Sequence, residues 1–536
     1  MIALLRARLW RDRVQVPLWI VGTALLAAAG YAGVVQSYGT VADRQEILAA
    51  VMANPVILMF RGLPSGTSEG AFLAFTLLPW LAMLAALMSA FLAVRHTRGD
   101  EEAGRAEPVS ATPAGRTAPI LATIVHGVLA DLVLGLATAL TLIGVGFDAA
   151  GSLVAGAAAG MVGIVFLGVG LVAAQLMRTS RGANALTVWT LMALFLLRGL
   201  GNAAGTPSDD LTRIDSSWLA WLSPFGWAEQ ARPFDADAWG PVALGIGVGV
   251  ALAVVAAALQ SVRDLGASLF PERRGRAGAT VTLSSPTALV WRLSGGALAG
   301  WAVGGALTGI LATTLSGAVR QITGQNPAVG QILEKIARAG SLDEAVITVF
   351  FTMLGILAAC AAVQTVVHAR QEEAHGTAEP VLASAVGRVR WLAGYLSVAT
   401  WAVLVVVGAA VATGCLALAA AGGESELYRV VVVTGLGQAV AASVFTVVAG
   451  LVFVLVPRAT IGVAWALIVV ATMLGMFGPL FGLPEWATDL SPFTQTPVVA
   501  QGDTDLRGLW WLLGAVAVGG AAALALMRRR ELTAGG

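Results

Sequence analysis

Long apolar runs, separated by short polar segments, fill almost the whole chain. Twelve runs reach the roughly 18–20 residues that a helix needs to cross about 30 Å of hydrocarbon. They lack the alternation of barrel strands, and lipid cannot satisfy unpaired backbone groups, so helices are the expected spanning form. The predicted spans are residues 16–38, 71–94, 118–146, 152–177, 184–203, 240–261, 297–318, 343–367, 391–420, 428–456, 460–482 and 508–527.

One polar segment occurs twice. HTRGDEEAGRAEPVSATPAGR (residues 96–116) and HARQEEAHGTAEPVLASAVGR (residues 368–388) align without a gap at an offset of 272, with eleven identities in 21 positions. Chance matches are rare among His, Arg, Glu and Pro, so the chain is expected to consist of two related halves. We therefore predict an all-α polytopic membrane protein: twelve transmembrane helices in two homologous six-helix halves, residues 1–265 and 285–536, joined by a cytoplasmic linker at 266–284.

Composition and charge agree with a membrane location and give an orientation. Hydrophobic residues make up 57% of the chain and charged residues only 12%, about half the usual share. With the N-terminus inside, 22 of the 32 basic residues lie in cytoplasmic segments, as the positive-inside rule requires. The basic start of the chain shows no cleavage site, so no signal peptide is expected. We expect both termini and both copies of the repeated segment in the cytoplasm, in a multi-pass protein of the cytoplasmic membrane. The net charge of +1 argues against a nucleic-acid partner.

Catalytic and metal-binding motifs are sparse. Lys335, the only lysine, does not lie in a Gly-Lys-Ser/Thr P-loop, so the chain is not expected to hydrolyse ATP. The GTSEG segment at 66–70 lacks the strand and helix that a nucleophile elbow needs. Cys360 and Cys415 lie in predicted spans and are expected to be buried small residues. No spacing of His, Cys and Asp resembles a zinc motif, and the sequence predicts no metal site.

The repeated segment has the layout of a docking element. In each copy a span ends at His-x-Arg and the chain turns at Glu-Pro, where proline disfavours helix at the preceding residue and can open a short new helix. A solvated loop that needs charge only for topology is the simpler interpretation. The presence of the segment in two diverged halves favours a short helix on the inner membrane face, with its acidic side chains available to a partner. The residues expected to take part are Arg98, Glu101, Glu107, Pro108, Arg370, Glu373, Glu379 and Pro380.

This layout resembles the ABC-2-type permeases of bacterial ABC exporters, in the fused actinobacterial form of the polyketide-antibiotic (tetronasin-type) multidrug exporters. In that family an interfacial elbow helix precedes the first span of each half, and a coupling helix joins the second and third spans. The resemblance covers essentially the whole chain. It places elbows at Leu4–Val14 and Pro286–Leu293 and coupling helices within Asp100–Thr112 and Glu372–Ser384. Matching pairs are Trp10-Arg11 with Trp291-Arg292, Arg178 with Arg458, Gly182 with Gly462, and Ser223-Pro224-Phe225 with Ser491-Pro492-Phe493.

The resemblance implies the permease subunit of an ATP-driven exporter that moves hydrophobic or amphiphilic compounds, such as antibiotics and drugs, out of the cell. Two copies of a separate nucleotide-binding ATPase subunit would each receive one coupling helix. Closure of the ATPases would switch the halves between inward-open and outward-open states. ATP and magnesium would be bound by the ATPases, and this chain would hold no cofactor. Its other partners would be membrane lipid and the hydrophobic small-molecule cargo.

Polar residues at membrane depth are the candidates for a cargo route. Asp131 in the third span and Arg198 in the fifth lie at similar estimated depths, which suggests an intramembrane ion pair. Alternatively, Asp131 is simply satisfied between packed helices. His126 and Gln175 are weaker candidates for lining a cavity. At an offset of 272 Asp131 falls on a valine, as does His126, so such a site would be asymmetric.

Two other classes of protein stay open. A proton-coupled facilitator also has two six-helix halves, and its second loop usually carries G-x-x-x-D-R-x-G-R-R; GDEEAGR at 99–105 is a partial match without the Asp-Arg. Facilitators lack interfacial elbows and large outer loops such as residues 204–239. A polytopic membrane enzyme is a third class, but no catalytic cluster is visible.

Overall fold

The computed structural model describes residues 1–52, 55–112, 115, 117–269, 278, 284–325, 342–477, 484–500 and 503–530. Within this part of the chain, twelve helices are long and apolar enough to cross a membrane, and each overlaps one predicted span. The protein is an all-α polytopic membrane protein, to which the described residues add only two short strand pairs.

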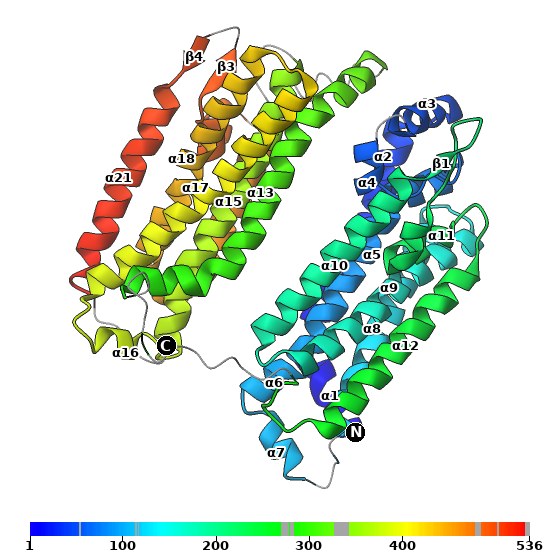
Figure 1. Ribbon diagram of the computed structural model, residues 1–536, viewed down its shortest axis with the longest axis horizontal. Helices are drawn as coiled ribbons and strands as arrows, with labels where there is room; N and C mark the ends of the chain where they lie inside the picture. The colour runs from blue at the N-terminus through cyan, green and yellow to red at the C-terminus, as the bar shows by residue number, and fades with distance from the viewer. Residues whose placement is uncertain are drawn as a thin grey trace. The chain divides into compact units, whose positions relative to one another are not determined.

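The chain divides into two compact units, Met1–Arg274 and Gly275–Gly536 (Figure 1). The boundary falls within the predicted linker at 266–284, most of which lies outside the described residues, as does Lys335.

The first unit contains six of the long helices. They are α2 (Gln15–Ser37), α5 (Glu69–Arg95), α8 (Ala118–Gly144), α9 (Ala149–Leu176), α10 (Ser180–Ala203) and α12 (Trp239–Val262). Helix α9 packs against α5, α8 and α12 and is buried along most of its length. Small residues permit this close packing: a Cβ at Gly156 would lie 2.2 Å from the carbonyl oxygen of Gly135 on α8. The polar side chains that α9 carries therefore face protein, not lipid.

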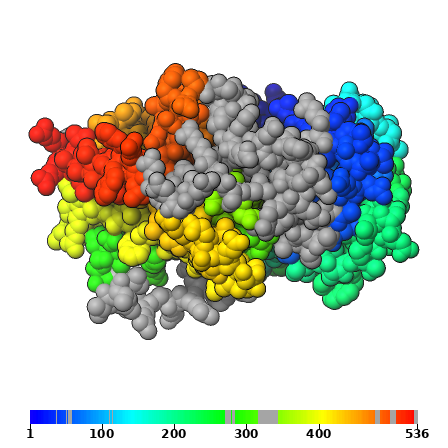
Figure 2. Space-filling model, turned by 90° about the horizontal axis from the view of Figure 1, so that it is seen from above, coloured from blue at the N-terminus to red at the C-terminus, as the bar shows by residue number. Residues whose placement is uncertain are grey.

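Short elements cap the two ends of the first unit. We call the end that carries the repeated segment the loop end of a unit, where the first unit has α1 (Ile2–Arg11), α6 (Arg98–Glu102) and α7 (Ala106–Ser110). At the opposite end lie α3 (Val41–Met52), α4 (Pro55–Phe60), η1 (Trp218–Leu222), α11 (Pro224–Gln230) and the antiparallel strands β1 (Thr206–Pro207) and β2 (Ile214–Asp215). Figure 2 shows α3, in blue, at the surface of that opposite end.

The second unit repeats the order of long helices. They are α13 (Pro286–Gln325), α15 (Leu342–Ala374), α17 (Arg388–Ala421), α18 (Ser425–Leu455), α19 (Thr460–Thr472) and α21 (Arg507–Met527). The shorter elements are α16 (Glu379–Leu382), η3 (Pro457–Ala459), the π-helical turn η4 (Met473–Phe477), α20 (Glu485–Thr488), η5 (Pro492–Thr494) and the antiparallel strands β3 (Val498–Ala500) and β4 (Asp503–Asp505). Helix α13 packs mainly on α17, and α15 packs on α18. One continuous apolar core joins these helices.

The predicted elbows differ between the units. In the first unit, α1 is a separate helix that ends at Arg11, and α2 begins at Gln15. In the second unit, Pro286–Leu293 is not a separate helix but the start of α13, and Figure 1 shows these first turns crossing the loop end of the unit.

The repeated loop also folds in two ways. The first copy forms two short helices, α6 and α7, whereas in the second copy α15 continues through the first part of the segment and only α16 is separate. Gly104 and Gly376, which are paired in the repeat, have φ values of +69° and +71°. This left-handed conformation is costly for residues with a Cβ, so it explains why glycine stands at both positions. Pro108 and Pro380 each lie in the first turn of a short helix, as expected.

Candidate functional site

An internal ion-pair cluster holds the first repeated loop to the transmembrane helices. The Arg98 guanidinium is 1% exposed; its Nη1 lies 2.7 Å from Glu101 Oε2, and it donates two further hydrogen bonds to the carbonyl oxygen of Ala174 at the end of α9. Arg263, directly after α12, forms a second ion pair with Glu101 and donates through Nε to Gln175 Oε1 at 2.8 Å. We call Arg98, Glu101 and Arg263 the first clamp. It links the loop to the ends of α9 and α12.

The second repeated loop has an equivalent cluster. Glu373 accepts two hydrogen bonds from Arg530 Nη2, at 2.6 and 2.7 Å, and lies 3.6 Å from Arg370. Arg530 follows α21, the last span of its unit, just as Arg263 follows the last span of the first unit. Arg388 donates to the carbonyl oxygen of Arg530 at 2.8 Å. We call Arg370, Glu373 and Arg530 the second clamp.

The clamps correct one expectation about the repeated loops. Glu101 and Glu373 were expected to be available to a partner, but the Glu101 side chain is only 7% exposed, Glu373 is buried, and both are paired within their own units. Glu–Arg pairs in so apolar a setting need their hydrogen bonds satisfied. The first clamp meets this need, whereas Arg530 Nη1 of the second clamp has no hydrogen-bond partner among the described residues. The Glu-Pro pairs, in contrast, are exposed in each loop: Glu107, Pro108, Glu379 and Pro380.

A second network in the first unit connects α1 to the loop. Arg11 donates to Asp100 Oδ1 at 2.6 Å, and Arg105 donates to the same oxygen at 2.9 Å. The buried Arg8 donates to the carbonyl oxygens of Pro119, at 2.6 Å, and His96, at 3.2 Å. Burial lowers the pKa of Arg8 to about 10, which leaves it charged at neutral pH. The first elbow is therefore fastened to the loop and to the start of α8.

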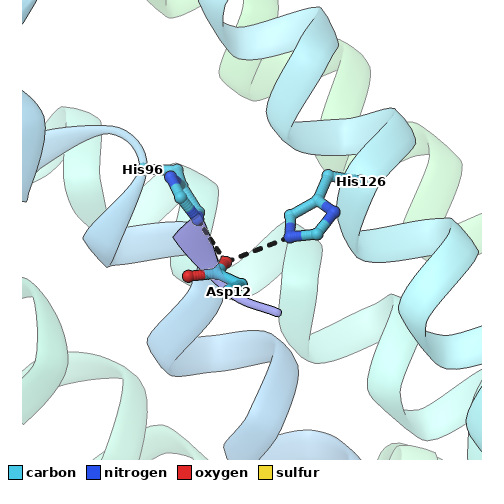
Figure 3. A group of neighbouring side chains, drawn as sticks. All are labelled: Asp12, His96 and His126. Carbon is cyan, nitrogen blue, oxygen red and sulfur yellow. Dashed lines mark hydrogen bonds and ion pairs between the residues drawn. The ribbon is translucent and has the colours of Figure 1, made fainter. Parts of the chain in front are cut away.

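Asp12 lies at the centre of this network, between two histidines (Figure 3). His96 Nε2 and His126 Nε2 lie 2.5 and 3.0 Å from Asp12 Oδ2, and Arg95 lies 3.0 Å from Oδ1. Burial alone would raise the pKa of Asp12, but the hydrogen bonds of His126 and His96, with the charge of Arg95, hold this pKa well below its usual range. No local sequence pattern indicated this cluster, because its members come from three distant segments.

A cavity of about 600 Å³ opens beside the cluster at the loop end of the first unit. Its walls come from α1, the α6–α7 loop, the start of α8 and the end of α12. They combine apolar side chains such as Leu4 and Val109 with charged ones such as Arg11 and Asp264. His96 reaches this wall, so the cavity gives small solutes a path to the buried cluster.

The candidates for a cargo route are all buried in the first unit. Asp131 is fully buried and contacts the Ser89 hydroxyl at 2.7 and 2.8 Å. A Cβ at Gly163 would lie 2.1 Å from Asp131 Oδ1, so glycine makes room for the carboxyl group between α8 and α9.

The expected pairing of Asp131 with Arg198 is wrong. Arg198 Nη1 lies 2.6 Å from Glu229 Oε1, and the other carboxylate oxygen of Glu229 accepts from Asn202 at 2.7 Å. Arg198 thus fastens α10 to α11 at the end opposite the loop.

His126 belongs to the Asp12 cluster and Gln175 to the first clamp, so both are bonded at the loop end. Neither residue lines the cavity at the loop end or a second, apolar cavity between α8, α9 and α12.

Two comparisons place this architecture among known proteins. The sequence model for the C-terminal domain of the multidrug efflux system permease Rv1217c matches residues 5–260 and 283–528. The multidrug efflux system permease protein Rv1217c of Mycobacterium tuberculosis (strain ATCC 25618 / H37Rv) is 34% identical over 520 residues, which is 96% of this chain and 91% of that protein.

Proposed function

The chain belongs to the family of the multidrug efflux system permease Rv1217c, and from this premise we propose that it is the permease subunit of an ATP-driven exporter. In this proposal two copies of a separate ATPase bind ATP and magnesium, and this chain carries no nucleotide and no catalytic group. The cargo consists of hydrophobic or amphiphilic compounds. The partner ATPase is inferred from the resemblance to ABC-2-type, tetronasin-type permeases, and the efflux role is inferred from the family.

The observation that carries the proposal is the form of the two loop ends. Each unit exposes a short helix that contains Glu-Pro, and an Arg–Glu–Arg clamp ties the preceding residues to the last span of the unit. A force applied to the exposed helix would therefore reach the transmembrane helices, which is what a coupling helix must achieve. The match of one family model to two segments supports a repeated architecture.

The chemistry of the exposed helices suits recognition by a basic groove. Glu107 and Glu379 occupy corresponding exposed positions, and each would pair with Arg or Lys of one ATPase copy. Ion pairs at such a rim set the register of docking more than its affinity. The buried clamps would keep each helix in one orientation, so that docking needs little further ordering.

The orientation of the chain in the membrane is inferred from the loop end of each unit. The N-terminal helix α1 and the residues after α21 both lie at the loop ends, where Arg11 contacts Asp100 and Arg530 contacts Glu373. Together with the positive-inside rule, this supports the proposal that both termini and both loops lie in the cytoplasm, in a protein of the cytoplasmic membrane.

Asp131 is the proposed cargo-route residue. A fully buried carboxyl group whose one hydrogen-bond partner among the described residues is a hydroxyl is costly at membrane depth, and this cost supports a role in transport. Asp131→Asn should reduce drug efflux while leaving ATPase association unchanged, since the residue lies away from the loop. Val403→Asn, at the matching position of the second unit, is the control. Normal efflux in Asp131→Asn would refute the role.

The buried Asp131 is also the one observation that favours a second candidate, a proton-coupled facilitator. A carboxyl group at membrane depth can carry a proton in such transporters. In that case the chain would transport drugs without an ATPase, and the loops would serve only topology.

The deciding experiment is affinity purification of the tagged chain from its native membrane, with mass spectrometry of what accompanies it. We expect a P-loop ATPase at two copies per chain. It should be lost when Glu107 and Glu379 are both changed to Arg. The charge-matched control is Asp209→Arg with Glu424→Arg, one exposed site in each unit at the end opposite the loop, and it should retain the ATPase. No ATPase, together with proton-driven transport by the chain alone in liposomes, would establish the facilitator instead.

A further inference from the structure

The Asp12, His96 and His126 cluster has no part in the function proposed above. Its residues come from three elements: Asp12 follows α1, His96 follows α5, and His126 lies in α8. All three side chains are buried, and Figure 3 shows both imidazole rings directed at one carboxylate. One ligand atom from each residue lies within 4.8 Å of the other two. Two imidazole nitrogens and one carboxylate oxygen are a common ligand set for divalent transition metals.

The spacing of these atoms is close to that of a metal site. Ligand atoms around a tetrahedral zinc ion lie about 3.3 Å apart, given bonds of about 2.0–2.1 Å. Here the two nitrogens lie 2.5 and 3.0 Å from Asp12 Oδ2. Replacing the protons of these hydrogen bonds by a metal ion requires the two nitrogens to move away from Asp12 Oδ2 by less than about 1 Å.

Arg95 sets the direction of the carboxylate. Its guanidinium lies 3.0 Å from Asp12 Oδ1, and this leaves Oδ2 for the two imidazoles. The Arg95 side chain is about one-third exposed, so it can withdraw toward solvent when a cation enters. Asp12 and Asp100 supply negative charge that offsets this arginine and Arg11.

Among the described residues, the outer nitrogens of both histidines have no hydrogen-bond partner. His96 Nδ1 and His126 Nδ1 are buried without a hydrogen bond, an uncommon and costly state for polar atoms. A metal ion at Nε2 would move each ring proton to Nδ1. There the proton of His96 would face Asp100 Oδ2, now 3.8 Å away. A carboxylate that accepts from the far nitrogen of a ligating histidine is a usual second layer of support in metal sites.

We propose that Asp12, His96 and His126 bind one divalent transition-metal ion of the zinc type, with water at the fourth position. The ion reaches the site through the cavity that His96 lines. It fastens α1 to α5 and α8 and draws Asp100, at the start of the first loop, toward His96. The site rests on the geometry of the first unit alone. Only its consequence, control of the first loop during transport, rests on the proposed function.

The test uses the full-length chain in detergent, freed of metal with a chelator and then titrated with zinc against a chromophoric zinc indicator. We expect one zinc ion per chain. His126→Val introduces the residue found at the matching position of the second unit, and Asp12→Asn removes the charge. Either change should weaken binding by more than the roughly 10- to 100-fold that loss of an outer-layer partner costs. His375→Ala, an exposed histidine of the second loop, is the matched control and should bind as the unchanged chain does.

A second measurement does not depend on the variants. Cobalt(II) added to the unchanged chain should give the visible absorption of a tetrahedral nitrogen and oxygen site, and zinc should abolish it. Absence of both this absorption and the bound zinc would show that the cluster is held by hydrogen bonds without a metal ion, and would overturn the proposal. Equal zinc binding by His126→Val and the unchanged chain would also overturn it. Because these are binding measurements, they can succeed even if no ATPase partner is found.

Discussion

The loop ends of the two units share one ion-pair cluster and differ in a second polar cluster. Each has an Arg–Glu–Arg clamp in which the second arginine follows the last span, Arg263 in one unit and Arg530 in the other. Only the first unit adds the Asp12 cluster, which fastens its separate elbow helix to the loop. In the second unit Val398 stands where the first has His126, and the alignment of the elbows places Leu293 opposite Asp12.

This difference separates the features that both loops need from those that serve one of them. The repeated residues are those that shape the loop and hold it to its own unit: the clamp residues, the left-handed glycine and the Glu-Pro pair. In the Asp12 cluster, by contrast, His96 is repeated as His368, whereas Asp12 and His126 occur once. The first loop is therefore fastened to α1 by this cluster in addition to its clamp, and the second loop has a different additional contact, between Glu372 and Tyr395 of α17.

The largest expected effect is on stability, from breaking the first clamp. Glu101→Ala leaves Arg98 and Arg263 buried without a counter-charge, and loss of one partner from a buried pair costs about 3–5 kcal/mol. Glu373→Ala should cost less, roughly 1.5–3 kcal/mol, because both arginines of the second clamp are 9% exposed, against 1% and 2% in the first clamp. Unfolding of the purified chain in detergent measures both, with exposed Glu107→Ala as the control. A melting temperature of Glu101→Ala equal to that of the control would contradict the clamp.

The next effect tests the network that the second unit lacks. Asp12→Asn removes the charge that accepts from His96 and His126, at an expected cost of about 1.5–3 kcal/mol. The pKa of Asp12 is held below its usual range in the folded chain. The contribution of Asp12 to the free energy of unfolding is therefore complete above the unfolded pKa of about 4, and it declines as the pH falls below that value. The difference in stability between the unchanged chain and Asp12→Asn should thus shrink on acidification. Leu293→Asn, at the matching exposed position of the second unit, should change the free energy of unfolding little. A loss of stability equal to that of Asp12→Asn would contradict the asymmetry between the two units.

The two loop glycines should respond alike. Gly104→Ala and Gly376→Ala place a Cβ in a left-handed conformation, at a cost of about 1–2 kcal/mol each. No atom lies within 4 Å of the added methyl group at either position, so the cost comes from the backbone alone. Gly387→Ala, where φ is −70° and the space is also open, is the control and should melt like the unchanged chain. A tolerated alanine at one of the two positions would show that the loops do not share this turn.

The smallest effect on stability should come from the exposed Glu-Pro pairs. Glu107→Arg and Glu379→Arg, made singly, should each alter the free energy of unfolding by no more than about 0.5 kcal/mol. Each should nevertheless reduce ATPase recovery on purification. Because the first loop is also fastened to α1 through the Asp12 cluster, we expect the larger reduction from Glu107→Arg. Equal reductions would show that the additional network does not affect docking.

Much of the fold could be predicted from local sequence. The twelve spans follow from run length, and most of their ends fall within a few residues of the prediction. The exceptions are α13, which extends beyond its predicted span at both ends, α15, which continues beyond its span, and α19, which ends at Thr472 where η4 begins. The predicted end of that last span, residue 482, lies outside the described residues. The short helices at Pro108 and Pro380 follow from the geometry of proline. The candidate site was found only in part: the repeated loop was recognised, but Arg98 and Glu101 were expected to face a partner and instead face their own unit. Charge shows that a residue needs a partner but not where that partner lies.

By itself, the sequence determined that the chain is a polytopic helical membrane protein with a repeated polar loop, because apolar run length and identity between segments are local properties. Only the tertiary structure decided which polar groups meet: Arg198 with Glu229 instead of Asp131, Gln175 with Arg263, and Asp12 with two histidines. Each of these partners lies at least 31 residues from the other in the chain. Their meeting depends on how each helix is rotated about its axis, and helices that are apolar on every face do not encode that rotation in their hydrophobic pattern.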